Sequence, residues 1–515
     1  MMLLWLIVIP LAGGAFAWYA GRVRPSWPRW ISLFSMLLMT WISVNIWVRH
    51  YVSVKGLEGR GPWVLEMRLD WIPRLGVSFH LAADGLSLLL VLLTSFLGMV
   101  AAASSWTEIR ERTGFFHLNL LWILAGIVGV FLAVDLFLFY FFWELMLVPM
   151  YLLIALWGHE NRRYAAFKFF IFTQAGGLLM LISILGLYFV HGKATGNYSF
   201  DYSDLLGSSM GPTTEFWLML GFFIAFAVKL PVVPLHNWLP DAHTEAPTAG
   251  SVVLAGLLLK TGAYGLIRFV LPLFPHASAE FAPTAIVLAV VGIIYGALTA
   301  FGQSDLKRLV AYTSVSHMGF VLLGVFAWSE IALQGAVMQM ICHGLATGAL
   351  FVIAGALQER IHTRELGRMG GLREAAPRMA AAALFFSLAS LGLPGLGNFV
   401  AEFLVLLGSY KSNIAATAVA AAGIVAATVY SLWIVQRVFH GPNEQKWNIP
   451  DLSLRETVVM AVMVLSLVWL GLYPQPVLNT SKQAISNMKF ISSAGRTVEN
   501  GAPGPMAHAE RGEAR

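Results

Sequence analysis

The stretch that decides the fold class reads LWILAGIVGVFLAVDLFLFYFFWELMLVPM and covers residues 121–150. Within it, Asp135 and Glu144 are the charged residues. An α-helix rises about 1.5 Å per residue, so roughly 20 apolar residues cross the ~30 Å hydrocarbon core of a bilayer. This stretch is long enough for parts of two membrane-spanning helices, which we place at 115–133 and 136–157.

Similar apolar runs recur from one end of the chain to the other. Hydrophobic residues make up 58% of the 515 residues and charged residues 12%, about half of the roughly 25% that is usual in soluble proteins. The mean hydropathy is +0.72. We therefore predict an all-α polytopic membrane protein with about 14 transmembrane helices. The further spans are expected near 2–20, 30–48, 82–103, 165–190, 214–239, 248–271, 281–301, 309–328, 331–357, 379–410, 412–437 and 456–476.

The charges and the single cysteine exclude several functions. Cys342 alone cannot form a disulfide framework, a Cys-ligated metal site or an iron–sulfur cluster. The net charge of +6 does not indicate nucleic-acid binding, because most loop Lys and Arg residues lie in the odd-numbered loops, as Arg22, Arg162 and Arg364 do. Positive loops face the cytoplasm, which predicts periplasmic termini. The first run has no cleavage site, so we interpret it as a retained helix and not a signal peptide.

Two of the predicted spans contain helix breakers. The first break is KLPVVP at residues 229–234 and the second is GLPGLGN at 392–398. Paired broken helices in the two halves of a membrane protein are typical of ion pathways in transporters. Proline and glycine are also common in ordinary membrane helices, so the breaks alone leave a purely structural interpretation open.

Four charged residues lie inside predicted spans: Glu144, Lys229, Lys260 and Glu402. A charge at the bilayer centre costs roughly 2.5–3.5 kcal/mol on insertion scales, so such residues are usually functional. A lysine near a helix end can extend to the interface, but Lys260 is about 12 residues, or roughly 18 Å, from either end of its span. A structural ion pair is the alternative for Glu144.

Histidines stand between these charges along the chain. His317 is the candidate relay histidine, and His236 and His343 are further candidates that are more readily interpreted as structural. No two His or carboxylate residues have a metal-ligand spacing on one helix face, so no metal site is predicted. Buried titratable groups spread over several spans are the elements of a proton relay.

We predict that Glu144 and Lys229 form a switch and that Lys260 and His317 pass the proton on to Glu402. Moving one proton against ~180 mV costs about 4 kcal/mol, and a pKa change of about 3 units corresponds to the same free energy. Other acidic and histidine residues have simpler interpretations. Helix N-capping accounts for Asp84 and Asp135, and exposure to solvent in a loop accounts for Asp241, His243 and Glu245.

Several segments, in the same order along the chain, resemble the subunit M family of bacterial proton-pumping NADH:quinone oxidoreductase (respiratory complex I), whose members are antiporter-like. They are HLAADGLS at 80–87, WELMLVPMY at 143–151, KFFIFTQ at 168–174, PLHNWLPDAH at 234–243, APTAGS at 246–251 and LLLKTGAYG at 257–265.

The resemblance implies a single integral membrane domain over residues 1–515. Two inverted five-helix repeats are expected at about 113–271 and 279–437, with helices 7 and 12 broken. Three N-terminal spans occupy 1–103, a last span lies at 456–476, and a polar, mobile tail is expected over 477–515.

The resemblance also implies a function. Glu144 and Lys229 would be the coupled pair, Lys260 the central relay, His317 a bridge and Glu402 the terminal residue. The chain would be a non-redox subunit of a translocase, coupling electron transfer from NADH to quinone in other subunits to proton transfer across the membrane. A subunit of a multi-subunit sodium/proton antiporter is the alternative.

No cofactor, metal or direct NADH binding is expected on this chain, since FMN and iron–sulfur clusters would lie in other subunits of the holoenzyme. The expected partners are other membrane-arm subunits, including neighbouring antiporter-like subunits, and lipids, but not nucleic acid. The expected location is the bacterial inner membrane.

Overall fold

The computed structural model describes residues 1–54 and 63–486. Twelve helical segments in this part of the chain are long and apolar enough to cross a membrane, which confirms the prediction of an all-α polytopic membrane protein. Ten of them are α1 (Met2–Gly21), α2 (Trp27–Val54), α3 (Gly85–Glu108), α4 (Thr113–Leu132), α7 (Arg162–Thr195), α14 (Pro275–Phe301), α15 (Leu306–Phe326), α16 (Glu330–Ile361), α20 (Ile414–Phe439) and α21 (Leu454–Leu472).

The other two spanning segments are built from several consecutive helices. The fifth consists of α5 (Leu136–Leu145) and α6 (Leu147–Trp157). Pro149 has no N–H to donate to Leu145, and the helix is interrupted at Met146, two residues after Glu144. The eighth consists of α11 (Thr248–Val253), η2 (Leu254–Leu258), α12 (Leu259–Gly265), η3 (Leu266–Val270) and α13 (Leu271–Leu273).

The predicted seventh and twelfth spans are discontinuous, as expected from their helix breakers. The seventh consists of α9 (Pro212–Lys229) and α10 (Trp238–Glu245), and the twelfth of α18 (Pro377–Ser390) and α19 (Gly397–Tyr410). In the first break the indole of Trp238 donates a 2.9 Å hydrogen bond to the carbonyl of Val228, replacing a helical bond that cannot form there. In the second, Gly392 and Gly395 adopt positive φ angles of 79° and 95°, which glycine tolerates without strain.

A β-hairpin that the sequence analysis did not anticipate precedes α3. Strand β1 (Leu65–Ile72) pairs antiparallel with β2 (Val77–Ala83) around η1 (Pro73–Leu75). The third span was expected to begin at 82, but Ala82 and Ala83 belong to β2. Asp84 caps α3 by accepting a hydrogen bond from the Ser87 amide, as predicted.

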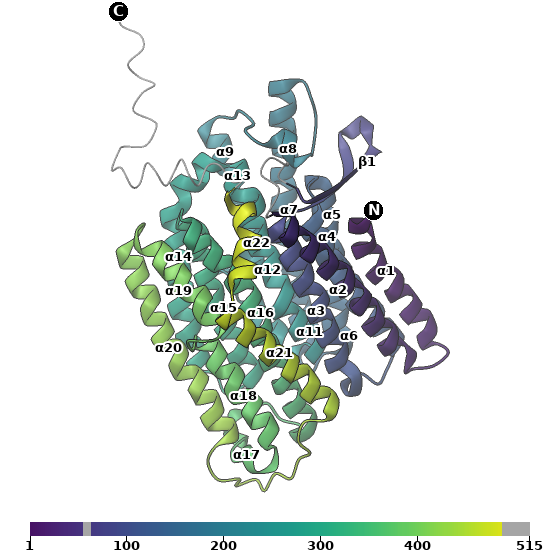
Figure 1. Cartoon of the computed structure of the whole chain (residues 1–515), viewed down its shortest axis with the longest axis vertical. Coiled ribbons are helices and arrows are strands. Elements are labelled where there is room, and N and C mark those ends of the chain that lie inside the picture. Colours follow the sequence, from purple (N-terminus) through teal and green to yellow (C-terminus); the bar gives the residue numbers. More distant parts are fainter. Residues whose placement is uncertain (55–62, 487–515) are drawn as a thin grey trace, which may run out of the picture.

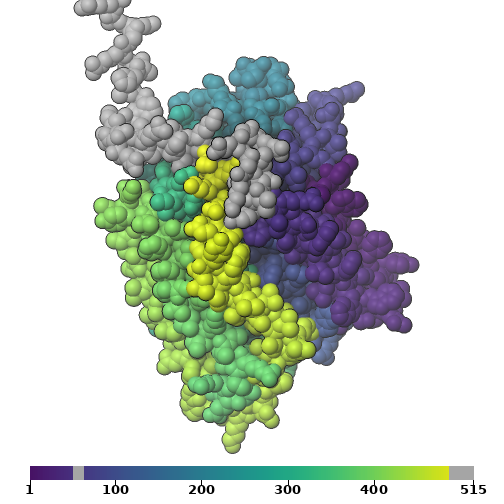
Figure 2. Space-filling model, viewed as in Figure 1, coloured from purple at the N-terminus to yellow at the C-terminus, as the bar shows by residue number. Residues whose placement is uncertain are grey.

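The prediction of a mobile tail from residue 477 was wrong for its first residues. Residues Gln475–Ser486 form helix α22, which packs against α3 and α16. The Trp47 indole also donates a 2.9 Å hydrogen bond to Thr480 Oγ1. Alternating apolar and polar residues at helical spacing give this segment one face that it can bury. Figure 2 shows α21 and α22 as a yellow band across one face of the molecule. Residues 487–515 lie outside the described part.

The loops separate to two ends of the molecule. The hairpin and α8 (Tyr202–Leu205) lie at one end, and α17 (Leu372–Ala375) lies at the other (Figure 1). A short turn, η4 (Leu366–Arg368), precedes α17 in sequence. Even-numbered loops thus lie at the hairpin end and odd-numbered loops at the α17 end, as a regular up-and-down chain requires. The membrane orientation and the inverted symmetry of the repeats stay predictions.

Candidate functional site

The centre of the bundle is formed by three spanning segments whose apolar windows are wholly buried: 248–273, α15 and α16. Lys260, His317 and His343 lie on these three segments in turn, with exposures of 0%, 1% and 0%. Helices that are apolar on all sides pack in the interior, and these three polar residues are therefore removed from lipid and from bulk solvent.

Lys260 lies on α12, between the two π-helical turns η2 and η3. Such turns widen the helix and are frequent at functional sites. Its Nζ donates a hydrogen bond to the carbonyl of Ala255 and lies 2.7 Å from Nδ1 of His343. A Cβ on Gly262 would stand 2.6 Å from the Phe226 carbonyl oxygen, so this glycine allows α12 to lie against the end of α9.

His343 was interpreted as structural, with a relay role left open. The structure places it between Lys260 and His317, since the two imidazole rings meet edge to face at a centroid distance of 5.6 Å. A charged Lys260 donates to Nδ1 of His343, so a neutral His343 carries its proton on Nε2. That Nε2 is buried and has no hydrogen-bond partner among the described residues.

His317 joins this group to Glu402 on α19. Its Nδ1 lies 3.0 Å from Oε1 of Glu402, and its Nε2 lies 3.0 Å from Ser390 Oγ and 3.2 Å from Tyr430 Oη. A carboxylate can only accept, so Nδ1–H donates to it and Nε2 of the neutral ring accepts from the hydroxyls. Gln339 Nε2 donates a further hydrogen bond of 2.9 Å to Oε1 of Glu402.

The predicted pair Glu144 and Lys229 is close but not in contact. Within the described part of the chain, neither residue takes part in an ion pair shorter than 4.0 Å. Lys229 Nζ instead lies 5.4 Å from the ring centre of Trp143 and 5.2 Å from that of Phe169. These cation–π contacts stabilise a buried ammonium group, while the half-buried Glu144 lies beside Gln174. A small side-chain movement is enough to change their separation.

His236, the remaining candidate, does not join this group. Its ring packs edge-on against Tyr295 and Tyr312, at centroid distances of 5.1 and 6.2 Å. Neither ring nitrogen has a hydrogen-bond partner in the described residues.

Comparison with known proteins identifies the family. The family model described as NADH:quinone oxidoreductase/Mrp antiporter, TM, matches residues 133–429. NADH-quinone oxidoreductase subunit M of Pseudomonas aeruginosa is 56% identical over 496 residues, covering 95% of this chain and 97% of that protein. The chain belongs to the subunit M family of NADH-quinone oxidoreductase.

Solved structures agree with this assignment. A chain of respiratory complex I from Thermus thermophilus with bound NADH shares the fold with a TM-score of 0.85 and 32% identity, over 95% of this chain and 100% of that one. A chain of the Mrp complex from Dietzia sp. DQ12-45-1b has a TM-score of 0.82 but 22% identity, over 96% of this chain and 98% of that one. At 22% identity, the likeness to the chain of the Mrp complex shows a shared fold alone.

This member of the subunit M family contains a buried ion pair that the sequence analysis missed. Arg268 on η3 pairs with Asp84 through a 2.5 Å contact, and both side chains are 5% exposed. Arg268 Nε also donates to Tyr264 Oη, which donates in turn to the carbonyl of Phe131. Arg268 lies two helical turns after Lys260, near the end of its span. A charged residue at this position in an apolar span was the signal in the sequence that a buried partner was needed.

The interpretation of Asp241, His243 and Glu245 as solvent-exposed loop residues was wrong. These residues lie on helix α10, which packs against α7 and α15. His243 is fully buried and stacks on Phe351 at a centroid distance of 4.4 Å. Asp241 pairs with Lys168 at 2.6 Å. The sequence could not reveal this, because α10 acquires its neighbours only through tertiary packing.

Lys307, which lies between the spans expected at 281–301 and 309–328, is also fully buried. Its Nζ donates a 3.2 Å hydrogen bond to the carbonyl of Ala246 and lies 3.3 Å from Nε2 of His159. Burial, together with the positive charges of Lys307, Arg364 and Arg162, lowers the pKa of His159 to about 3. His159 is therefore neutral at physiological pH and can accept a hydrogen bond from Lys307.

At the opposite end of the molecule, His80 joins the hairpin to the loop that carries α8. Its Nδ1 lies 2.6 Å from Asp201 and its Nε2 2.8 Å from Glu66. Burial opposes the charged ring, but the hydrogen bonds to Asp201 and Glu66 outweigh it and raise the pKa of His80. Burial likewise opposes charge on Asp201, and the His80 hydrogen bond outweighs it and lowers the pKa of this carboxyl.

Over residues 1–54 and 63–486, no group of three or more His, Cys, Asp or Glu residues is arranged to hold a metal ion. The titratable side chains of the central site can accept and release protons.

Proposed function

We propose that this chain translocates protons through Lys260, His343, His317 and Glu402 as a membrane subunit of NADH:quinone oxidoreductase. Electron transfer from NADH to quinone takes place in other subunits and drives this movement. The observation that supports the proposal most strongly is the 2.7 Å contact between Lys260 and His343. The 3.0 Å contact between His317 and Glu402 continues this series of titratable groups.

Each imidazole can accept a proton on one nitrogen and release it from the other. His343 takes the proton from Lys260 at Nδ1 and releases the proton held on Nε2. His317 takes up a proton on the Nε2 side, where the hydroxyls of Ser390 and Tyr430 lie, and releases the Nδ1 proton to Glu402. Between Nε2 of His343 and Nε2 of His317 the proton passes through a bridging water, since no direct hydrogen bond joins the two rings in the described residues.

The pair Glu144 and Lys229 supplies the coupling in this proposal. Lys229 is buried between two aromatic rings, and the negative charge of Glu144 stabilises its charged form. Approach of the two side chains favours both charged forms, and separation disfavours them. A movement driven from a neighbouring subunit can therefore change the electrostatic field at Lys260.

The proposal extends to partners and location. Other membrane-arm subunits and lipids surround the chain in the bacterial inner membrane, with both termini in the periplasm. The holoenzyme carries its FMN and iron–sulfur clusters in other subunits. A multi-subunit sodium/proton antiporter remains the second candidate on fold grounds, but the relative that is 56% identical favours the first.

The test uses the intact holoenzyme in inverted membrane vesicles. Glu144→Gln and Lys229→Ala are each expected to abolish NADH-driven acidification and to lower quinone reduction if the steps are tightly coupled. Lys193→Ala, at an exposed lysine near the end of α7, is the control. Normal proton pumping by an assembled Lys229→Ala enzyme contradicts the proposal. Pumping that requires Na⁺ in the medium favours the antiporter alternative.

A further inference from the structure

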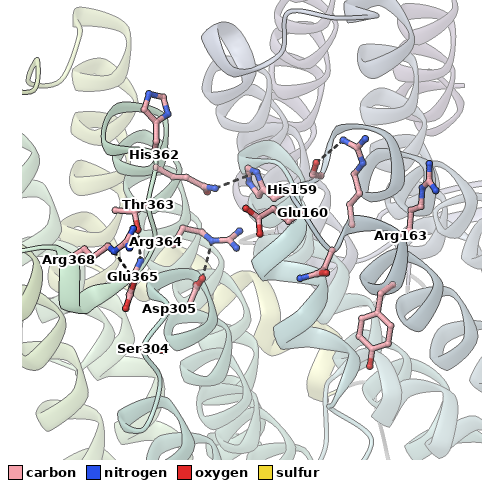
Figure 3. Close-up of a pocket in the computed structure, with 15 residues that line it drawn as sticks. His159, Glu160, Arg163, Ser304, Asp305, His362, Thr363, Arg364, Glu365 and Arg368 are labelled. Carbon is pink, nitrogen blue, oxygen red and sulfur yellow. Dashed lines mark hydrogen bonds and ion pairs between the residues drawn. The ribbon is translucent and has the colours of Figure 1, made fainter.

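The arginines at the end of the bundle that carries the odd-numbered loops differ in whether they have an acidic partner. A hollow of about 1140 Å³ opens there among the loops between α6 and α7, between α14 and α15, and after α16. Figure 3 shows Arg364 at this hollow, where its Nε lies 3.0 Å from a carboxylate oxygen of Asp305. Arg29 and Arg455, at the same end, form no ion pair shorter than 4.0 Å within the described part of the chain.

Arg29 on α2 and Arg455 on α21 meet at the connection between α3 and α4. Arg29 Nη2 donates a 3.0 Å hydrogen bond to the carbonyl of Ile109, and its guanidinium carbon lies 5.8 Å from the ring centre of Trp106. Arg455 Nη2 donates a 3.4 Å hydrogen bond to Thr107 Oγ1. Both guanidinium groups are therefore held on one short segment, and their positive charges repel each other.

Each of these two side chains has more hydrogen-bond donors than acceptors beside it. A guanidinium group carries five N–H donors, and Arg29 and Arg455 each use one in the contacts above. Both side chains are half-buried, and the Nε atoms of both are buried without a hydrogen-bond partner among the described residues. Buried donors without acceptors cost free energy. An anion placed between the two groups would supply the missing acceptors.

The nearby carboxylates do not fill this role. Glu359 and Glu456 both act on the charge of Arg455, but Glu456 pairs with Arg360 at 2.8 Å. Glu359 accepts a 3.0 Å hydrogen bond from the threonine hydroxyl that also holds Arg455. Arg29, the other member of the pair, has no acidic group acting on it among the described residues. The three arginines thus carry one more charge than the two glutamates.

An apolar stripe runs along α2 from this arginine pair. Trp30 packs edge-on against Trp106 at a centroid distance of 5.0 Å, next to the ring that Arg29 covers. Phe34, Leu37 and Trp41 follow at helical spacing, and these three and Trp30 are each more than half exposed. Tryptophan is enriched where a membrane helix crosses from headgroups to hydrocarbon. The stripe therefore provides a surface for acyl chains directly beside the two positive charges.

We propose that Arg29 and Arg455 bind the phosphate of an anionic phospholipid whose acyl chains lie along this stripe of α2. Arginine binds phosphate oxygens through two parallel N–H donors, and basic pockets between transmembrane helices are typical sites for anionic lipid headgroups. The phosphate removes the repulsion between the two guanidinium groups and accepts from their unused donors. The lipid links α2 to α21 at a place apart from the proposed relay, so its test does not depend on proton pumping.

The direct test is a density map of the intact holoenzyme in phosphate buffer, in nanodiscs that contain phosphatidylglycerol. A phosphate group within hydrogen-bond distance of Arg29 and Arg455 is expected, continuous with acyl-chain density along α2. An isolated density of the size of inorganic phosphate overturns the proposal of a lipid. An empty site overturns it as well, and so does an acidic side chain of a neighbouring subunit between the two arginines.

A pair of variants measures the contribution of the two charges. The double variant Arg29→Gln with Arg455→Gln keeps hydrogen-bond donors but removes both charges. After extraction from vesicles of phosphatidylglycerol and phosphatidylcholine, it is expected to retain about one phosphatidylglycerol fewer per holoenzyme than the unmodified enzyme, by mass spectrometry of the bound lipid. The matched control is Arg373→Gln with Arg437→Gln, because both arginines are exposed at the same end and are not adjacent to the pair.

The control variant is expected to retain as much phosphatidylglycerol as the unmodified enzyme. Equal retention by the unmodified enzyme and the Arg29 and Arg455 double variant overturns the proposal, as does an equal loss in the control. If the double variant does not assemble, the density map of the unmodified holoenzyme decides between the same outcomes.

Discussion

Lys260 Nζ and His343 Nδ1 lie 2.7 Å apart at the centre of the bundle, although 83 positions separate the two residues in the chain. The contact joins the eighth span to α16 and turns a lone buried lysine into a donor with a defined acceptor. It also explains why His343, which the sequence analysis favoured as structural, stands in the line of proton transfer that we propose.

Replacing this acceptor should interrupt the relay. His343→Ala removes the group that takes the proton from Lys260, so we expect NADH-driven proton pumping to fall by about tenfold or more. The measurement is the initial acidification rate of inverted vesicles, normalised to the amount of assembled holoenzyme. His276→Ala, at an exposed histidine, should pump normally, and an equal loss in both variants would contradict a specific role.

Glu402→Lys should retain more proton pumping than Glu402→Ala. A lysine at this position still titrates, and the site can accommodate it: the His317 ring can accept on Nδ1, and the Gln339 amide can rotate its unpartnered Oε1 toward the ammonium group. Both variants are compared by protons taken up per NADH oxidised. Equal loss in the two would mean that only a carboxylate can do this task.

Gly177→Ala should disturb Glu144 without a large loss of stability. A Cβ at this position would lie 2.6 Å from Glu144 Oε1, the movable end of a side chain. We expect the carboxylate to shift and the pumping rate to fall severalfold, with little change in the thermal unfolding of the holoenzyme. Gly292→Ala is the control, because its Cβ would meet nothing closer than 3.9 Å. Unchanged pumping would show that the position of Glu144 is not critical.

Asp84→Asn should destabilise the subunit. The change leaves the buried Arg268 guanidinium without its 2.5 Å ionic partner, and breaking a buried pair on one side costs about 3–5 kcal/mol. The expected result is poor assembly or a clearly lower unfolding temperature, measured by thermal denaturation of the purified holoenzyme. The double replacement of Asp84 and Arg268 by Asn and Met should be milder than Asp84→Asn alone; a worse outcome would contradict the explanation by an unpaired charge.

The hairpin should loosen at alkaline pH. The pKa of His80 is raised, so the stability contributed by its charged form is fully present below the ordinary histidine pKa of about 6.5 and is lost as pH rises through the higher folded-state value. Amide hydrogen exchange over residues 65–83, corrected for its intrinsic pH dependence, should therefore increase in that range. His80→Gln should remove the pH dependence, and its persistence in this variant would assign the effect to another group.

The sequence determined the membrane class and the positions of the spans, because apolar length and the missing N–H of proline act locally. The breaks after Lys229 and around Gly392 were predictable for this reason, and so were the helix caps at Asp84 and Asp135. The hairpin was not, and its contact from His80 to Asp201 reaches a loop more than a hundred residues away.

Tertiary packing alone decided which polar groups meet. Whether a charged residue is buried, as Lys307 is, or placed beside a partner, as Arg268 is beside Asp84, depends on helices that are distant in the chain. A residue's type shows that it needs a partner in a low-dielectric interior. Only the packed bundle determines that Lys260 finds His343, and that Lys229 lies between aromatic rings and not against Glu144.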